Sequence, residues 1–352
     1  MSERILVYGA GAIGGQVAGR LASAGHDVTA AEPWAAHREA INARGISIRS
    51  LDGSVETHRL RAVAPEALEG PFDVLFLAVK SYDTLPVLER VLPLLAPGAP
   101  VVSTQNSINE EWVAPVVGAG RVVGGVILVN AVLLEPGRIS ATASVTQASA
   151  STRLPGVFVG EYQQPAGSLA RRIAGLLEAV WPAVAIDDLL HERWSKMVNN
   201  TMLNTTSGVS GLRSADLLAD VNARRALVGI AAEVLRVAEA DGHPLEKVMG
   251  DFTVRQVLNG AAGRDGVFER GLAERASRVS PDAATSLLQD VLRRRPTEVD
   301  YFSGLIARKG AAHGIPTPWC AAVTEMVHRV ESGALAPAPE NLAALTRNAT
   351  VF

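Results

Sequence analysis

The chain has 352 residues, of which 48% are hydrophobic and 20% are charged, and its formal net charge at pH 7 is -3. This composition is typical of a folded protein with room for two domains, and so mild a charge argues against a nucleic-acid partner or an anionic membrane. A single cysteine excludes an internal disulfide and indicates a reducing compartment. With an apolar strand at the start and no apolar run of roughly 20 residues, we expect a cytoplasmic protein.

Short apolar strands alternate with amphipathic helices through the first half of the chain. The pattern predicts strands over residues 5–8, 27–31, 73–79 and 100–104, and helices over residues 13–24, 34–44 and 85–95. Segment 121–162 is rich in Val, Thr, Ser and Gly, and we expect it to supply the last strands of the same sheet. The alternation predicts an α/β fold with a doubly wound, mostly parallel sheet of the Rossmann type.

The second half of the chain carries longer helical patterns. They predict helices over residues 188–206, 214–241, 245–260, 281–294 and 297–312. Ser280 and Thr297 are the expected caps of the last two helices, and Gly314 is the expected end of the last one. The tail from Gly333 is expected to be a loosely packed extension. We therefore expect a dinucleotide-binding Rossmann domain over residues 1–187 and an all-α catalytic domain over residues 188–352.

A G-x-G-x-x-G sequence lies between the first strand and the first helix. The first glycine permits a tight turn, the second lets the backbone approach a pyrophosphate, and the third lets helix and strand pack closely. The helix N-terminus then offers free N–H groups to the phosphates. The sequence predicts a dinucleotide site that includes Gly9, Gly11, Ala12, Ile13 and Gly14.

Glu32 ends the second strand, where an acidic side chain accepts hydrogen bonds from the adenosine ribose of NAD. A 2′-phosphate beside that carboxylate would be repelled, and the nearby Arg38 belongs to the following helix. We therefore favour NAD over NADP, and the alternative is that Glu32 merely begins a solvated loop.

Lys196, Asn200 and Asn204 are four residues apart in a helical segment. Each step of four advances about 40° around a helix, so the three side chains share one face. Hydride addition to a carbonyl creates an alkoxide, which needs a proton and electrostatic stabilisation. A lysine ammonium supplies both, and asparagine amides can align the substrate.

A second polar cluster contains Ser286 and Glu298 on successive predicted helices. Glu298 falls in the first turn of its helix. Capping accounts for the neighbouring Ser280 and Thr297, whereas periodicity leaves open whether Glu298 turns inward.

Together these residues resemble the ketopantoate reductase (2-dehydropantoate 2-reductase) family along nearly the whole chain. The motifs that carry the resemblance are Gly9-x-Gly11-x-x-Gly14, Val79-Lys80-Ser81-Tyr82, Gln105-Asn106, Glu192-x-Trp194-x-Lys196-x-x-x-Asn200-x-x-x-Asn204, Ser286-x-Leu288-Gln289-Asp290 and Thr297-Glu298-x-Asp300-Tyr301.

The resemblance implies a nicotinamide-dependent reductase of a small 2-oxo acid, with Lys196 as general acid and Glu298 positioning lysine and substrate. It implies that the substrate contacts Asn106, Asn200, Asn204 and Ser286. It also implies that Asn106 and Lys80 lie at the cofactor.

Two departures from the family pattern concern the cofactor pocket. The family usually has Asn-Gly where this chain has Asn106-Ser107. It also usually carries a basic residue near the end of the second strand, whereas this chain has Glu32 there. These differences favour, as an alternative, an NAD-dependent dehydrogenase of the same family that acts on another 2-hydroxy acid.

Two further alternatives remain. The β-hydroxyacid dehydrogenases also have a Lys-x-x-Asn-Asn element, but they carry glycines before the lysine, where this chain has residues 190–194. An NAD(P) sensor without turnover is the second alternative. Since no histidine has metal-ligand spacing to another histidine or to the cysteine, we expect no metal. A homodimer is a possible assembly.

Overall fold

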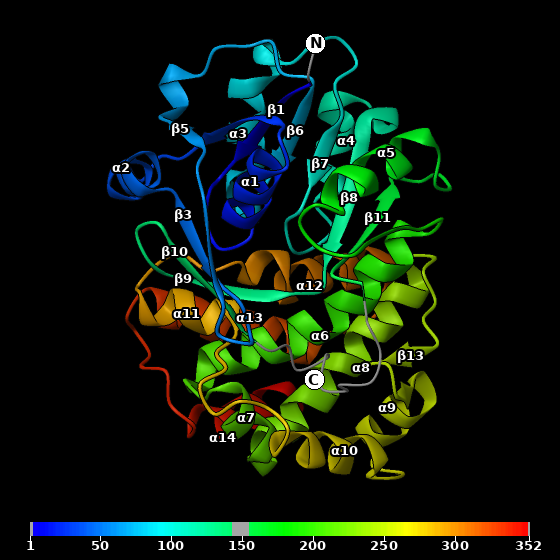
Figure 1. Ribbon diagram of the computed structural model, residues 1–352. Coiled ribbons are helices and arrows are strands. Elements are labelled where there is room, and N and C mark those ends of the chain that lie inside the picture. The colour runs from blue at the N-terminus through cyan, green and yellow to red at the C-terminus, as the bar shows by residue number, and fades with distance from the viewer. Residues whose placement is uncertain (1–2, 143–154, 351–352) are drawn as a thin grey trace. The chain divides into compact units, whose positions relative to one another are not determined.

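The structure is a computed structural model that describes residues 3–142 and 155–350. The chain divides into two compact units, one that runs to Glu192 and one that begins at Arg193. The division falls inside helix α6 (Leu189–Ser210), which is labelled in Figure 1.

The first unit contains an eight-stranded sheet in the order β12-β11-β8-β7-β6-β1-β2-β5. All neighbours are parallel except β8 and β11, which pair antiparallel. The strands are β1 (Arg4–Tyr8), β2 (Asp27–Ala31), β5 (Arg61–Val63), β6 (Val74–Leu77), β7 (Val101–Ser103), β8 (Val122–Ile127), β11 (Val157–Glu161) and β12 (Ala183–Ala185).

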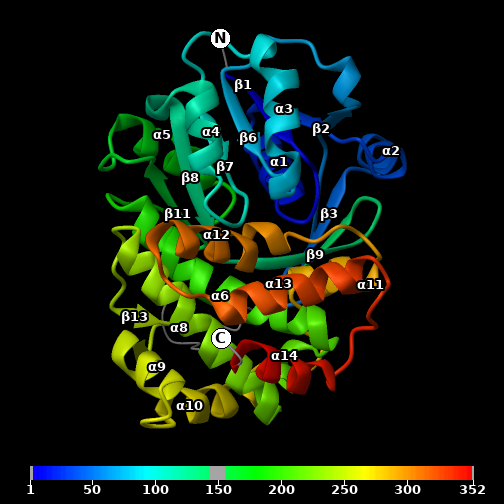
Figure 2. The same ribbon diagram turned by 180° about the vertical axis from the view of Figure 1, so that it is seen from behind.

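Helices cover both faces of this sheet. Figure 1 shows α1 and α5 in front of it, and Figure 2, from behind, shows α3 and α4 on the opposite face. The helices are α1 (Gly14–Ser23), α2 (Ala35–Arg44), α3 (Thr84–Val91), α4 (Glu110–Val117) and α5 (Ser168–Leu177). The predicted doubly wound α/β fold is confirmed, although the sequence patterns did not predict α4 and α5.

A second, four-stranded sheet has the order β4-β3-β10-β9. Its strands are β3 (Ile46–Arg49), β4 (Val55–His58), β9 (Asn130–Glu135) and β10 (Arg138–Thr142). The expectation that all of segment 121–162 completes the main sheet is therefore wrong for β9 and β10. The buried Ile46 and Ile139 of this sheet pack against Gly15 of α1, where a Cβ would stand 2.5 Å from the Ile46 side chain. Their burial against the helix explains why these strands leave the main sheet.

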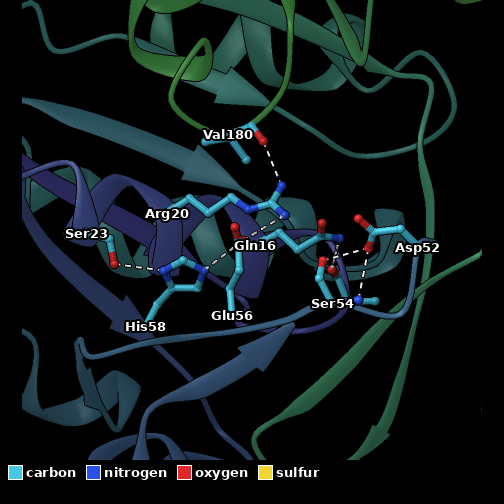
Figure 3. A network of polar contacts seen from close by, with 9 residues as sticks. Gln16, Arg20, Ser23, Asp52, Ser54, Glu56, His58 and Val180 are labelled. Atoms are coloured by element: carbon cyan, nitrogen blue, oxygen red, sulfur yellow. Dashed lines mark hydrogen bonds and ion pairs between the residues drawn. The ribbon is translucent and has the colours of Figure 1, made fainter. Parts of the chain in front are cut away.

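Polar contacts also tie this second sheet to α1 (Figure 3). The Ser23 hydroxyl lies 2.7 Å from Nδ1 of the buried His58, and Arg20 pairs with Glu56 at 3.3 Å. Arg20 also donates to the carbonyl oxygen of Val180 at 2.7 Å. These contacts fix β4 at the C-terminal end of α1, far along the helix from its glycine-rich start.

The second unit is helical apart from a short ladder of β13 (Lys247–Val248) and β14 (Phe252–Thr253). The predicted all-α class is therefore confirmed in outline, with this ladder as a small exception. With α6, its helices are α7 (Ser214–Ala219), α8 (Val221–Ala240), α9 (Val254–Ala261), α10 (Val267–Ala276), α11 (Ser286–Leu292), α12 (Ser303–His313), α13 (Pro318–Glu331) and α14 (Asn341–Thr350).

Two predicted helices of this unit begin or break elsewhere because of their caps. The helix expected over 214–241 is two helices, since Asp220 adopts an extended conformation and accepts a hydrogen bond from the Ala223 N–H at 2.8 Å. The helix expected over 245–260 begins only at Val254, after a capping box of Thr253 and Gln256.

The last part of the unit also differs from the prediction. Helix α11 begins at Ser286 because Thr285, not Ser280, caps it. The helix expected over 297–312 starts as a 3₁₀ turn and is interrupted at Phe302 before α12, which ends at Gly314 as predicted.

The tail is not a loose extension, because α14 packs with Leu342 and Leu345 fully buried. It contacts α8 and α13. Among the described residues, no helix combines the length and the apolar character that crossing a bilayer requires.

Candidate active site

The glycine-rich loop between β1 and α1 has the backbone geometry of a phosphate cradle. Gly9 has a φ of +92°, which favours glycine, and a Cβ on Gly14 would stand 1.9 Å from the Gly9 carbonyl oxygen. Apart from Gly11 itself and its two neighbours in the chain, no described atom comes within 4 Å of the place that a Cβ on Gly11 would take. The first turn of α1 contains no acidic residue. A pyrophosphate therefore fits this loop, with the open side at Gly11 and the helix N-terminus behind it.

Glu32 follows β2 and lies beside this loop. Its carboxylate is buried and accepts the Ala10 N–H at 3.0 Å and the Trp34 N–H at 2.8 Å. Arg38 donates to the Glu32 backbone carbonyl at 2.8 Å, so its guanidinium also lies at the end of β2. Glu32 thus holds the loop backbone, a role that the motif alone did not predict.

Lys80 and Asn106 follow the neighbouring parallel strands β6 and β7, so both lie at the same edge of the sheet. Asn109, which is fully buried, donates to the Ser81 hydroxyl at 3.1 Å and also to the Asn106 carbonyl oxygen. Ser81 and Asn109 join the two loops. Sequence reasoning missed Asn109, because a buried amide in a loop carries no periodic signal.

Ser107 has a φ of +70°, in the left-handed region that favours glycine. A serine there costs on the order of 1 kcal/mol relative to glycine. The Asn106-Ser107 departure therefore keeps the backbone conformation that an Asn-Gly pair adopts easily, at a cost in local strain.

In the second unit, the structure brings three of the predicted site residues together. Asn204 Oδ1 accepts the Ser286 hydroxyl at 3.0 Å and the Leu287 N–H at 3.1 Å. Asn204 Nδ2 donates to the Asn200 carbonyl oxygen at 3.0 Å. The buried Asn204 amide thereby fixes the start of α11 against α6 and orients Ser286, which lies 82 residues later in the chain.

Lys196 lies one turn before Asn200 on α6. Burial, and next the Arg193 guanidinium, lowers the pKa of Lys196 to about 7, while the Glu298 carboxylate opposes this change. Glu298 is itself buried, so it does turn inward and acts on Lys196 electrostatically. A lysine with this pKa can both donate and accept a proton near neutral pH.

The first unit thus carries a loop that suits a dinucleotide, and the second carries a lysine that suits proton transfer. Comparison with known protein families agrees with both. Residues 5–150 match the model "Ketopantoate reductase PanE/ApbA", and residues 188–331 match the C-terminal model of the same family. A 2-dehydropantoate 2-reductase of Mesorhizobium japonicum is 29% identical over 342 residues, which cover 93% of this chain and 97% of that protein.

Solved structures are similar over nearly the whole chain. A PanE/ApbA family ketopantoate reductase from Ralstonia eutropha is 26% identical, with a TM-score of 0.75 and coverage of 94% of this chain and 99% of that chain. A D-mandelate dehydrogenase bound to NADH and anilino(oxo)acetate has a TM-score of 0.77 at 23% identity, with the same coverage of both chains, which shows a shared fold.

Proposed function

The chain belongs to the ketopantoate reductase family of oxidoreductases, and from this premise we propose that it reduces ketopantoate to pantoate with a nicotinamide dinucleotide. The observation that carries the proposal is Lys196, whose pKa of about 7 suits a general acid and which shares a helix with Asn200 and Asn204.

The five candidate site residues of the second unit then have defined roles. The Lys196 ammonium gives a proton to the carbonyl oxygen of the oxo acid as its carbonyl carbon gains a hydride, and the neutral amine regains a proton from water. In the reverse direction, the neutral amine removes the hydroxyl proton. The negative charge of Glu298 favours the protonated form of Lys196, while Asn200, Asn204 and Ser286 bind the substrate oxygens.

The residues of the first unit would hold the cofactor, which supplies or takes up the hydride when bound. Gly9, Gly11, Ala12, Ile13 and Gly14 would receive the pyrophosphate. Lys80 and Asn106 would lie at its nicotinamide half.

The identity of the cofactor depends on Glu32, whose carboxylate would accept hydrogen bonds from the adenosine ribose. We propose NAD as the preferred cofactor, because a 2′-phosphate would lie beside this buried negative charge. The Arg38 Nη1 already donates to the Glu32 and Pro33 carbonyl oxygens, which directs part of its hydrogen-bonding capacity away from a phosphate.

The direct test follows absorbance of the reduced nicotinamide with ketopantoate, in parallel with NADH and NADPH. Turnover is expected, and a Lys196→Ala variant that folds should lose at least roughly a hundredfold in kcat. Absence of turnover with both cofactors, or full activity in the variant, would contradict the proposal.

The cofactor preference is tested separately with Glu32→Ala. The variant removes the charge and also one acceptor of the loop, and the second effect weakens both dinucleotides alike. The ratio of kcat/KM for NADPH to that for NADH is therefore free of the effect on the loop. It should rise, because the variant removes both the charge that repels a 2′-phosphate and the acceptor for the ribose of NADH. An unchanged ratio would show that Glu32 does not discriminate.

A second candidate is an NAD-dependent dehydrogenase that acts on a different 2-hydroxy acid. It is favoured by Glu32 and Ser107, which depart from the family pattern, and by the fold shared with a D-mandelate dehydrogenase whose structure contains NADH. Oxidation of a panel of 2-hydroxy acids with NAD, ranked against pantoate by kcat/KM, distinguishes the two candidates.

A further inference from the structure

His37 is a fully buried histidine in the first turn of α2, and both of its ring nitrogens contact backbone. Nε2 lies 2.8 Å from the Ala10 carbonyl oxygen, and Nδ1 lies 2.9 Å from the Gly137 nitrogen. Because a backbone N–H can only donate, Nδ1 is the acceptor and Nε2 carries the ring proton. His37 therefore donates to the glycine-rich loop and accepts from Gly137.

The Ala10 backbone is consequently held from two sides. Its N–H donates to Glu32 Oε2 at 3.0 Å, and its carbonyl oxygen accepts from His37. In a planar trans peptide the C=O and the following N–H point in opposite directions. Fixing the Ala10 carbonyl thus directs the Gly11 N–H away from His37. Gly11 is the glycine with open space beside it, since only its own chain neighbours come within 4 Å of the place of a Cβ.

Gly137 lies in the turn between β9 and β10, and hydrogen bonds hold this turn in place. The Gly137 carbonyl oxygen accepts the Ser47 N–H at 2.8 Å, and Arg44 donates to the Pro136 carbonyl oxygen at 2.6 Å. His37 therefore connects the turn of the four-stranded sheet to the loop before α1.

We propose that His37 is a positioning residue of the dinucleotide site, which aims the Gly11 N–H at the pyrophosphate of the bound cofactor. This inference rests on the proposed function, since it presupposes that the chain binds a nicotinamide dinucleotide. It assigns a role to a histidine that has no motif around it. It also makes the β9–β10 turn part of the support of the cofactor loop.

Two amide substitutions separate the two hydrogen bonds of the ring. Glutamine places its amide nitrogen near the position of Nε2, so His37→Gln keeps the donor to Ala10 and loses the acceptor for Gly137. Asparagine reaches only the position of Nδ1, so His37→Asn keeps the acceptor and loses the donor. Both variants have lost one hydrogen bond and carry a smaller side chain, so a merely structural role predicts similar effects for the two.

The measurement is the dissociation constant of NADH from the full-length chain without oxo acid, by fluorescence titration, with thermal midpoints recorded alongside. His37→Asn should weaken NADH binding roughly tenfold, the scale of one hydrogen bond, whereas His37→Gln should stay within about threefold of the wild type. Hydrogen exchange of residues 9–14 without cofactor should be faster in His37→Asn than in His37→Gln.

His58→Leu is the matched control, since His58 is also buried and ties the same small sheet to the other end of α1. It should lower the thermal midpoint and leave the NADH dissociation constant unchanged. Equal NADH affinity and equal loop exchange in the Asn and Gln variants would overturn the role of His37. A wild-type chain that binds neither NADH nor NADPH would instead refute the proposed function, and this inference with it.

Discussion

At the scale of single residues, the proposed chemistry depends on how three charges balance at Lys196. An exposed lysine stays protonated at neutral pH and is a poor base. Burial, followed by the Arg193 guanidinium, lowers the pKa of Lys196 to about 7, and the Glu298 carboxylate partly reverses the shift. The helical spacing predicts Lys196 from sequence, but this balance requires Glu298, which comes from a different segment.

The two charged neighbours should move the pH profile of reduction in opposite directions. Reduction needs protonated Lys196, so kcat/KM should fall as pH rises through the lysine pKa. Glu298→Gln removes the charge that raises this pKa, so the alkaline limb should move to lower pH by roughly half a unit or more. Arg193→Gln removes a charge that lowers it, so the limb should move to higher pH. The measurement is kcat/KM for the oxo acid between pH 5 and 10.

Because the expected shifts of the alkaline limb have opposite signs, each of the two variants serves as the control for the other. A general loss of structure would lower the plateau of both variants without displacing the limb. Shifts of the same sign in both variants, or none in either, would remove Lys196 as the titrating acid.

At the scale of elements, helices, strands and loops were predicted correctly where the residues that determine them are neighbours in the chain. The G-x-G-x-x-G loop, β1, α1 and β2 follow from neighbouring residues, as does the end of α12 at Gly314. The failures occur where two caps compete, as Ser280 and Thr285 do, or where a cap interrupts an apolar pattern, as Asp220 does. The apolar pattern continues from α7 into α8, so periodicity predicts one helix, and the single extended residue Asp220 that divides it leaves no periodic signal.

The site shows the same division between local and long-range information. The face of Lys196, Asn200 and Asn204 is predictable because it needs only helical spacing. The bond between Asn204 and Ser286 joins residues 82 apart. His37 contacts the loop 27 residues before it and a turn 100 residues after it. No spacing rule encodes such contacts, because they depend on how elements pack.

Helix α13 illustrates an element that is held in place by a buried carboxylate. Glu233 of α8 accepts the Trp319 N–H and the Cys320 N–H, each at 2.8 Å, at the start of α13. Burial raises the pKa of Glu233 to about 7, although these two backbone donors oppose the shift. The folded chain therefore keeps a proton on Glu233 at pH values where the unfolded chain has released it.

This difference predicts a defined pH dependence of stability. The stabilising contribution of the bound proton is fully present below about pH 4.5 and is lost as pH rises through about 7. In urea unfolding at pH 5 to 8, the free energy of unfolding of the wild type should fall relative to Glu233→Gln, by at most about 1.4 kcal/mol per pH unit. Glu325→Gln, an exposed change on α13, is the control and should track the wild type. A constant difference between wild type and Glu233→Gln would exclude this titration.

At the scale of the whole molecule, the two compact units carry different parts of the proposed chemistry. The first unit holds the glycine-rich loop with its supports, Glu32 and His37, and the second holds Lys196 and Glu298. Binding of a dinucleotide should therefore stabilise mainly the first unit, because a ligand stabilises the state that binds it.

Hydrogen exchange with and without NADH tests this division over the entire chain. At an NADH concentration one hundred times its dissociation constant, linkage gives about 2.7 kcal/mol of stabilisation of the binding-competent state. Slower exchange should appear in segments 9–14, 32–38 and 104–109, which carry the loop, its supports and the proposed nicotinamide contacts. At the same free NADH concentration, His37→Asn should show weaker protection, since its affinity is expected to be lower. Protection confined to the second unit would show that the dinucleotide binds elsewhere, and the glycine-rich loop would then have a structural role only.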